Sequence, residues 1–494
     1  MKAKFIFIIL IAAVCASCSD FLNIRSEGSM PSSGTDYSKP ENIFLPVSAA
    51  YASMRLNEGQ AQSYVGVLEI VSDDADKGSD PSDGPTVAEL DKFTYGPDNN
   101  NVDAMWNYFY DIVSAANYAV ESMDKFKAAI TSEDGLLQVE QCRGEAKIIR
   151  AYAYFNLVRL FGTVPKIDRT MTANELASTP VSTAEQLYDF IYEDLDAAIA
   201  SVPASYPAGY PGRYTRYTAM ALKAKVALYR KDWKEAATQA DAIIASGKFA
   251  LLSRFKDAFS VEYENGSESL MEIQSSDMDQ TSDPLPVNYY AFIQGPRGNT
   301  PSNMQGWGYK VPSQKLMSFL DGRGDAVRKA VTVLERGTKT AEGDSIKVSC
   351  TNPYYNGKVY TPSSGSKRSY NGYGLDHNMR IIRYAEILLI YAEAMVNGAA
   401  ITPASGYTAD LALNEVRGRA GLAAAAATLD NIYDERRAEL AMEENRFFDL
   451  VRTGKAVEVL GPMGYKAGKN ELFPIPSAER QLNPNLPQTP GYTY

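Results

Sequence analysis

Apolar residues recur with the period of an α-helix over much of the chain. One face of residues 102–126 carries Trp106, Phe109, Tyr110, Val113, Asn117 and Val120. A second helix is predicted over residues 139–161, because Gly162 followed by Pro165 is typical of a helix end. We expect these two helices to pack as an antiparallel pair.

The same period predicts more helices toward the C-terminus. Residues 184–201 begin one pair, and residues 217–246 form another with a turn at Lys231-Asp232-Trp233. Ala236, Ala240 and Ile243 match the small or apolar positions of a tetratricopeptide second helix. Further helices are predicted at residues 315–320, 380–397, 411–419 and 429–452. The pattern indicates a mostly α fold with tetratricopeptide-like helix pairs, whose number stays open.

Helical periodicity is lost over residues 265–378. Gly, Pro, Ser, Asn and Tyr crowd this segment, with breaks at Pro284, Pro286, Gly295, Pro296, Gly298, Pro301, Gly306 and Gly308. We expect an irregular lobe of loops and short strands, and an extended, Pro-rich tail from residue 473. Long loops on a rigid helical frame are common places for binding sites.

The first residues have the pattern of a secretory signal. Lys2 and Lys4 precede an apolar run over residues 5–14, which is too short to span a bilayer. Small residues then lead to Cys18, and we expect residues 1–17 to be removed and Cys18 to carry lipid. Cleavage before Cys15 and an ordinary secretory peptide are the alternatives. No later apolar run approaches the ~18 residues of a membrane span, so the lipid would be the only membrane anchor.

The acidic balance of the chain limits its partners. The 60 Asp and Glu residues outnumber the 49 Lys and Arg residues, and the formal charge is −11. Polyanion binding needs clustered basic residues that displace counterions, so we expect no nucleic-acid partner.

Residues for nucleophilic catalysis and metal binding are few. His377 is the single histidine, and no known catalytic motif surrounds it. We expect it to be a helix cap or a surface group. A histidine-rich zinc site is excluded, because the chain has only one histidine. Cys142 and Cys350 have no companion at metal-site spacing and are interpreted as structural. A disulfide between them stays open, because their proximity does not follow from the sequence.

Acidic residues are numerous, so pairs that resemble catalytic carboxylates occur by chance. Glycosidase chemistry needs only two of them across a cleft, and composition does not exclude it. One acidic group recurs at helical spacing beside arginines: Glu435, Glu439, Glu443 and Asp449, with Arg436, Arg446 and Arg452. We interpret this group as buried ion pairs that support the fold.

An acidic run near the N-terminus suggests calcium at first sight. It consists of Asp73, Asp74, Asp76, Asp80 and Asp83. The run fails the EF-hand pattern at Gly78, Ser79 and Pro85. We therefore predict a solvated, ligand-facing loop with no metal or cofactor, and an irregular calcium site is the alternative.

Two loops combine aromatic and polar residues in a way that suits sugars. Sugar recognition needs flat apolar surface for ring faces and directed polar groups for hydroxyls. The chain has 32 Tyr against 18 Phe, so its aromatic surface is rich in rings with a polar tip. The first loop holds Asp73, Asp74, Lys77, Phe93, Tyr95, Asn99, Asn100 and Asn101. The second holds Tyr289, Tyr290, Phe292, Gln294, Arg297, Asn303, Trp307 and Tyr309.

Several segments, in order along nearly the whole mature chain, resemble the SusD/RagB family. The N-terminal half matches at Cys18, Asp20, Phe21 and Leu22, then at Gly144-Glu145-Ala146, Arg150-Ala151-Tyr152 and Phe161-Gly162. The C-terminal half matches at Gly324-Asp325, Arg383-Tyr384-Ala385-Glu386, Arg419-Ala420-Gly421-Leu422, Glu435-Arg436, Phe473-Pro474-Ile475-Pro476 and Asn483-Pro484-Asn485-Leu486. Two positions depart from the family pattern: Glu444 stands where glycine is usual, and Thr489 where asparagine is usual.

The resemblance implies a SusD-like fold in which helix pairs support the irregular lobe of residues 265–378. It divides the chain into residues 18–215, a helix pair at 216–264, and a C-terminal region at 265–494. It also places the ligand site where the loop before the helix of Trp106 meets the lobe, with Trp106 itself in the core. The predicted ligand residues are Trp307 and Tyr290 as stacking platforms, Asp74, Asn100 and Arg297 as hydrogen-bonding groups, and Tyr95 and Tyr289 beside them.

The function that the resemblance implies is nutrient capture without catalysis. We expect a lipid-anchored protein on the outer face of the outer membrane that binds an oligosaccharide and delivers it to a SusC-like TonB-dependent transporter. A peptide receptor of the RagB type is the first alternative, and a surface glycosidase is the second. The identity of the glycan and its linkage stay open.

Overall fold

A computed structural model describes residues 34–207, 209–275, 288–299, 305–363 and 377–493. The predicted signal peptide and Cys18 lie outside these residues, as does Asn303. Within the described ranges, no helix is both long enough and apolar enough to cross a membrane.

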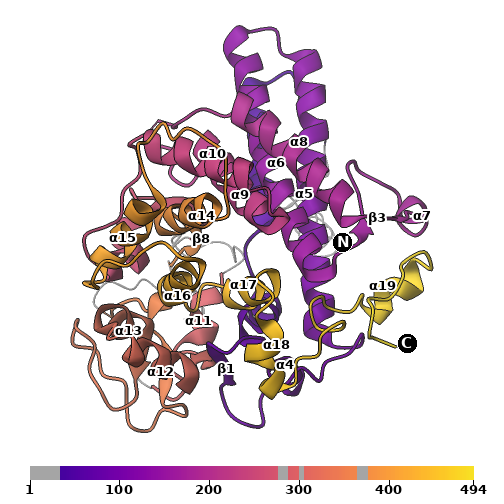
Figure 1. The fold of residues 1–494 in the computed structure, drawn as a ribbon. Helices are drawn as coiled ribbons and strands as arrows, with labels where there is room; N and C mark the ends of the chain where they lie inside the picture. The colour runs from indigo at the N-terminus through magenta and orange to yellow at the C-terminus, as the bar shows by residue number, and fades with distance from the viewer. Residues whose placement is uncertain (1–33, 208, 276–287, 300–304, 364–376, 494) are drawn as a thin grey trace, which may run out of the picture.

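The N-terminal half is built from long helices that pack side by side (Figure 1). They are α5 (Asn100–Ala129), α6 (Glu133–Phe161), α8 (Ala184–Ser201), α9 (Arg216–Arg230) and α10 (Trp233–Ala245). The Asn99 side chain accepts hydrogen bonds from the backbone N–H groups of Asn101 and Val102, which starts α5. Gly162 ends α6 with a φ of 74°. The predicted pairing of the two long helices is confirmed, and Trp106 is buried in the core.

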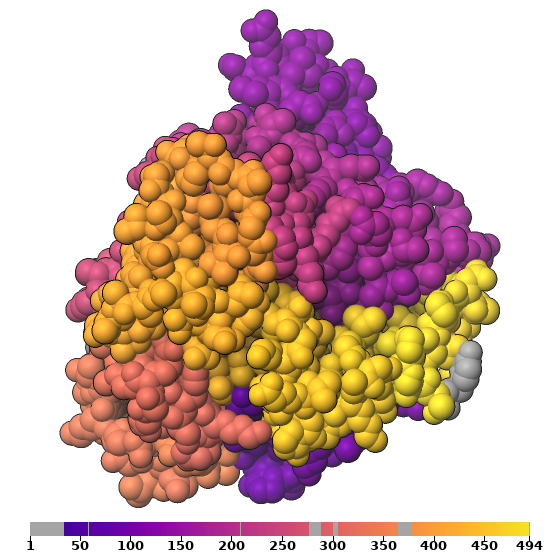
Figure 2. All heavy atoms as spheres, in the orientation of Figure 1, coloured from indigo at the N-terminus to yellow at the C-terminus, as the bar shows by residue number. Residues whose placement is uncertain are grey.

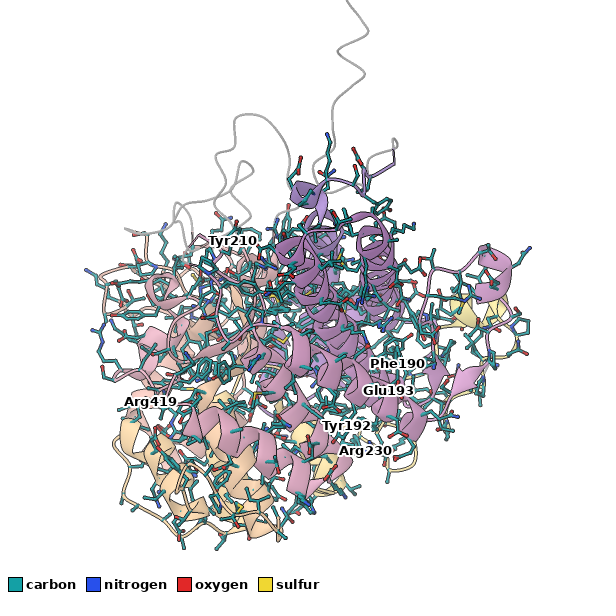
Figure 3. All side chains as sticks on the ribbon, turned by 90° about the horizontal axis from the view of Figure 1, so that it is seen from above. Phe190, Tyr192, Glu193, Tyr210, Arg230 and Arg419 are labelled. Carbon is teal, nitrogen blue, oxygen red and sulfur yellow. The ribbon has the colours of Figure 1, made fainter. Side chains whose placement is uncertain are left out.

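Ion pairs and ring contacts join α6, α8 and α9. Arg150 on α6 binds the buried Asp194 on α8 through two hydrogen bonds of 2.7 and 2.8 Å. Arg230 at the end of α9 lies 5.1 Å from the ring centre of Tyr192 on α8, and Figure 3 shows these two residues near each other at the edge of the helical body. A two-bond guanidinium–carboxylate pair fixes the relative orientation of two helices better than apolar contact alone.

Shorter elements precede and connect these helices. They are η1 (Pro40–Asn42), α2 (Leu45–Ser53), α3 (Glu58–Val65), the π-helix η2 (Gly66–Ile70), β1 (Ala75–Gly78), α4 (Pro85–Asp91), β2 (Val164–Pro165), α7 (Ala173–Leu176) and β3 (Val181–Ser182). Helix α3 begins with a capping box between Asn57 and Gln60. The helical periodicity described above did not identify these segments, because most are too short to show a repeat.

The irregular lobe is confirmed as loops, short helices and two-stranded sheets. The described elements of the lobe and of the segments directly flanking it are η3 (Phe255–Phe259), η4 (Val261–Tyr263), β4 (Ser269–Ile273), α11 (Tyr290–Gln294), β5 (Tyr309–Pro312), α12 (Gln314–Gly322), α13 (Ala326–Thr332), β6 (Val333–Glu335), β7 (Tyr354–Asn356), η5 (Gly357–Val359) and β8 (Met379–Arg383). Antiparallel pairs form between β1 and β5, β4 and β8, and β6 and β7. The β1–β5 pair attaches the lobe to the N-terminal half of the chain, and the β4–β8 pair joins the two ends of the lobe.

The C-terminal region returns to helices. They are α14 (Tyr384–Val396), α15 (Ala409–Arg419), α16 (Leu429–Leu440), α17 (Arg446–Arg452), α18 (Ala456–Leu460), η6 (Gly461–Met463) and α19 (Ser477–Leu482). The helix predicted at residues 380–397 starts four residues late, because β8 pairs with β4. The single helix predicted at residues 429–452 is wrong. It is two helices, since Met442 and Glu444 adopt φ values of 67° and 57°, which no α-helix contains.

A network of buried charges holds the C-terminal helices to the lobe. Arg383 lies at its centre and donates hydrogen bonds to the carboxylates of Glu268, Glu439 and Glu443. Arg328 and Arg419 add ion pairs to Glu435 and Glu439. A second group joins Asp449 to Arg436 and Arg452. The interpretation of these acidic residues as buried ion pairs is confirmed.

The structure changes the expectation for His377 and answers the open question about Cys142 and Cys350. His377 is 3% exposed, so it is not a surface group, and burial holds the pKa of its imidazole well below the usual value. Both cysteines are buried and free. Cys142 belongs to the main core, whereas Cys350 lies in a small cluster of the lobe, so no disulfide joins them.

Candidate functional site

The two aromatic loops predicted to meet are joined directly by a strand pair. Ala75 in β1 lies opposite Pro312 in β5, and Gly78 lies opposite Tyr309. The Ser79 N–H continues the pairing by donating to the Gly308 carbonyl at 2.6 Å. Position 78 requires glycine, because its φ is 69° and a Cβ would stand 2.3 Å from the Gly308 oxygen. The acidic run therefore leads into a strand whose partner carries the second loop.

Three aromatic rings form a cluster at this junction. The Trp307 ring centre lies 6.5 Å from that of Tyr289 and 5.8 Å from that of Phe292. Phe292 is buried, while Tyr289 and Trp307 are partly exposed. Gly306 permits the close approach, since a Cβ there would stand 2.1 Å from the Phe292 oxygen. A buried ring thus supports two outer rings that keep surface available to a ligand.

A charged group is held in the same pair of loops, since the Gly306 N–H donates to the carbonyl of Pro296, the residue before Arg297. Arg297 forms an ion pair with Asp83 and donates to the Ser79 hydroxyl at 3.1 Å. Lys77 stabilises the turn after β1 by donating to the carbonyls of Asp80 and Asp83 at 2.9 and 2.8 Å. The side chains of Arg297 and Asp83 are 37% and 30% exposed, so both can still reach a ligand. A guanidinium and a carboxylate side by side offer a donor and an acceptor for hydroxyl groups.

Asn100 is exposed at the first turn of α5. Its neighbours are fixed, since Asn99 caps the helix and also donates to Glu89 at 2.8 Å. The Asn101 amide donates to the Thr86 hydroxyl at 2.9 Å, which ties α5 to the start of α4. Asn100 therefore presents an exposed amide group from a rigid base, and its oxygen accepts a 3.3 Å hydrogen bond from the Asn101 side chain.

The structure buries three of the predicted ligand residues. The Tyr95 ring stacks on Phe473 at 5.1 Å, and Tyr290 donates its hydroxyl hydrogen to Glu444 at 2.8 Å. Asp74 is fully buried and accepts a 2.8 Å hydrogen bond from Arg437, and burial raises the pKa of its carboxyl. These three side chains have internal partners and serve the fold. Asp73 is also buried, so the acidic run is not a solvated loop at its start.

The structure adds two polar residues that the predicted set lacked. Asp83 pairs with Arg297, and Ser79 binds both of them through its hydroxyl group. A signal existed for Asp83, because Asp-Gly-Pro at residues 83–85 marks a turn that projects side chains. The sequence contains no signal for Ser79. Its φ of 55° is rare for serine, so the direction of its side chain could not be predicted.

Comparisons with known proteins agree with this architecture. A family model described as the SusD family matches residues 332–492, and one described as starch-binding associating with outer membrane matches residues 58–228. SusD-like protein P2 of Formosa agariphila is 29% identical over 531 residues, covering 99% of this chain and all of the relative.

Solved structures extend the similarity to three dimensions. A laminarin-binding SusD-like protein is 26% identical, with a TM-score of 0.78 over 92% of this chain and 99% of that one. Surface glycan-binding protein A from Bacteroides fluxus is 25% identical, with a TM-score of 0.76 over 92% of this chain and all of that one. The family models, the full-length relatives and the shared fold lead to one conclusion: the chain belongs to the SusD family.

Proposed function

We propose that this protein binds an oligosaccharide on the partly exposed rings of Trp307 and Tyr289 and releases it chemically unchanged. The observation that carries the proposal is that the same pair of joined loops presents these rings and the Arg297–Asp83 ion pair. Stacking on an aromatic face and hydrogen bonding to an adjacent charged pair are the two interactions that sugars need. Asn100 is the further polar group in this proposal.

The comparisons support a glycan as the ligand. The similar structure named for laminarin binding covers nearly the whole chain, and a second is named as a surface glycan-binding protein. Laminarin and its oligosaccharides are therefore the first ligands to test. The affinity need only be modest, on the order of −4 to −8 kcal/mol, because a receptor that hands its ligand on must also release it.

The cellular role in this proposal is delivery. Cys18 would carry the lipid anchor on the outer face of the outer membrane, and a SusC-like TonB-dependent transporter would receive the glycan. The support is the family membership and the description of the model that matches residues 58–228. Co-purification of a barrel protein with the lipidated chain, lost on Cys18→Ala, tests both parts.

The ligand site is tested by Trp307→Ala. We expect affinity for the bound glycan to fall about five- to tenfold, since stacking on one ring contributes about 1–1.4 kcal/mol. Isothermal titration calorimetry against laminarin oligosaccharides and other glycans measures this. Trp233→Ala is the matched control, because Trp233 is also partly exposed but lies at the start of α10. Equal affinities for the two variants would refute the site.

Two further experiments on the same purified protein distinguish glycan binding from the alternative functions. Calorimetry against peptides should give no heat of binding if the ligand is a glycan. Chromatography after prolonged incubation with polysaccharide should show no shorter product. A cleaved product would establish a glycosidase and reject the proposed function, and tight peptide binding would favour a receptor of the RagB type.

A further inference from the structure

A tight turn of the lobe is fastened to the loop that carries Arg297. It spans residues 347–350, and the Cys350 N–H closes it by donating to the Lys347 carbonyl at 3.0 Å. The fully buried Asn299 accepts from the Lys347 N–H at 3.0 Å and from the Cys350 thiol at 3.7 Å. One buried side chain, two residues after Arg297, therefore holds both ends of the 347–350 turn.

Further contacts bring the turn directly against the backbone of Arg297. The Thr351 N–H donates to the Arg297 carbonyl at 3.3 Å. A Cβ at Gly298 would stand 3.5 Å from the backbone oxygen of Ser349 and 3.8 Å from the Cα of Cys350, which is ordinary van der Waals contact. The turn and the loop of Arg297 thus form one continuous surface.

Arg297 connects this turn to the aromatic cluster. A Cβ at Gly308, the residue after Trp307, would stand 3.1 Å from the Cβ of Arg297 and 3.2 Å from the side-chain nitrogen of Asn352. In Figure 2 the salmon surface of the lobe meets the indigo surface of the N-terminal segment toward the lower edge of the molecule, where Figure 1 labels β1 and α4. The ring of Trp307, the loop of Arg297 and the 347–350 turn are therefore neighbours.

The tip of the turn presents an apolar side chain to solvent. Val348 is 81% exposed, more than any other large apolar side chain in the described part of the chain. Ile346 and Cys350 on either side are buried in the small core of the lobe, whereas Ser349 and Thr351 are exposed. Turns favour Gly, Asn, Asp and Ser, so neither the turn nor the core requires valine at this position. A contact made only with a ligand would give its two methyl groups a function.

We propose that the 347–350 turn is the outer wall of the glycan site, and that Val348 contacts a sugar unit beyond the one stacked on Trp307. The inference rests on the proposed function, because the rings must hold the first unit. An apolar contact between hydroxyl groups suits a sugar, and the exposed hydroxyls of Ser349 and Thr351 lie on either side of the turn tip. The ligand class is then a chain of several sugars, since a disaccharide on the rings is too short to reach the turn.

Val348→Ser tests this wall in solution. Serine suits a turn and removes both methyl groups, and the protein should fold normally because Val348 is exposed. We expect affinity for laminarihexaose to fall about three- to fivefold and affinity for laminaribiose to stay unchanged in calorimetry. The hexasaccharides and disaccharides of starch and cellulose are measured in parallel. Val457→Ser is the matched control, because Val457 is 55% exposed on the distant helix α18.

The outcomes separate this inference from the proposed function. If Trp307→Ala weakens binding of the hexasaccharide but Val348→Ser does not, the turn is no part of the site and the proposed function stands. An equal loss for the hexasaccharide and the disaccharide would also overturn the inference, because Val348 would then act through the shape of the loop. If Trp307→Ala leaves the affinity unchanged, the ring site and the outer wall are rejected together.

A crystal structure with the bound hexasaccharide gives a direct view of the same contact. We expect one sugar unit within about 4 Å of the methyl groups of Val348 while another lies on the ring of Trp307. A chain that leaves the rings in a direction away from the 347–350 turn would overturn the inference.

Discussion

Replacing Arg383 by methionine should lower the free energy of unfolding by about 3–5 kcal/mol. Arg383 is 2% exposed and forms hydrogen bonds of 2.7 Å to Glu268, 2.7 Å to Glu443 and 3.0 Å to Glu439. The substitution keeps an unbranched side chain but leaves three buried carboxylates without their shared cation. Urea denaturation followed by circular dichroism measures the difference.

An exposed ion pair provides the control for this substitution. Lys127 binds Glu140 at 2.8 Å, but the two side chains are 59% and 37% exposed. Lys127→Met should change the free energy of unfolding by less than about 1 kcal/mol, since water screens the pair. A similar loss in both variants would show that burial of the Arg383 network does not matter.

The effect of Arg383→Met should depend on pH in a definite direction. Burial alone would raise the pKa of Glu439, but Arg419 and Arg383 hold it well below its usual range. A depressed pKa stabilises the folded state above the unfolded value of about 4.3, and this stabilisation disappears as the pH falls toward the folded value. The difference between wild type and Arg383→Met should therefore be largest near neutral pH and shrink in acid.

The helices that the sequence predicts well are those with a long apolar period. The segment at residues 184–201 forms a helix with the same bounds, because Thr183 and Gln186 supply a local start signal in a capping box. The break after Leu440 could not be predicted. Met442 and Glu444 have no preference for positive φ, and they are held there by residues of the lobe, such as Lys310, which bonds the Met442 carbonyl at 2.8 Å.

In the candidate site, too, local features could be predicted from the sequence, whereas features set by contacts with distant residues could not. Composition located the two loops, but it could not decide which side chain of a neighbouring pair faces outward. Tyr289 is partly exposed, whereas Tyr290, the next residue, points inward to Glu444. Asp74 is buried because Arg437, 363 positions later in the chain, pairs with it. Contacts over such separations leave no mark in the local pattern.

Replacing Glu444 by glycine, the residue usual in the family at this position, should destabilise this protein. Glycine would relieve a positive φ of 57°, a gain of about 1–2 kcal/mol. It would also remove the carboxylate that pairs with Lys310, whose side chain is 0% exposed, at a cost of about 3–5 kcal/mol. The lost ion pair outweighs the relieved strain, and we expect a net loss of about 1–4 kcal/mol in urea denaturation.

A second substitution separates the two contributions. In Glu444→Gly with Lys310→Met, no buried cation is left without a partner, while the relief of strain remains. The double variant should recover most of the stability that Glu444→Gly loses, and Lys310→Met alone should be destabilised because Glu444 then stays buried and unpaired. Glu69 is also buried here, and burial raises its pKa to about 8, so at neutral pH it is mostly protonated and is a poor substitute anion for Lys310. If the double variant were no more stable than Glu444→Gly, charge pairing would not be the reason that this chain tolerates glutamate in a left-handed position.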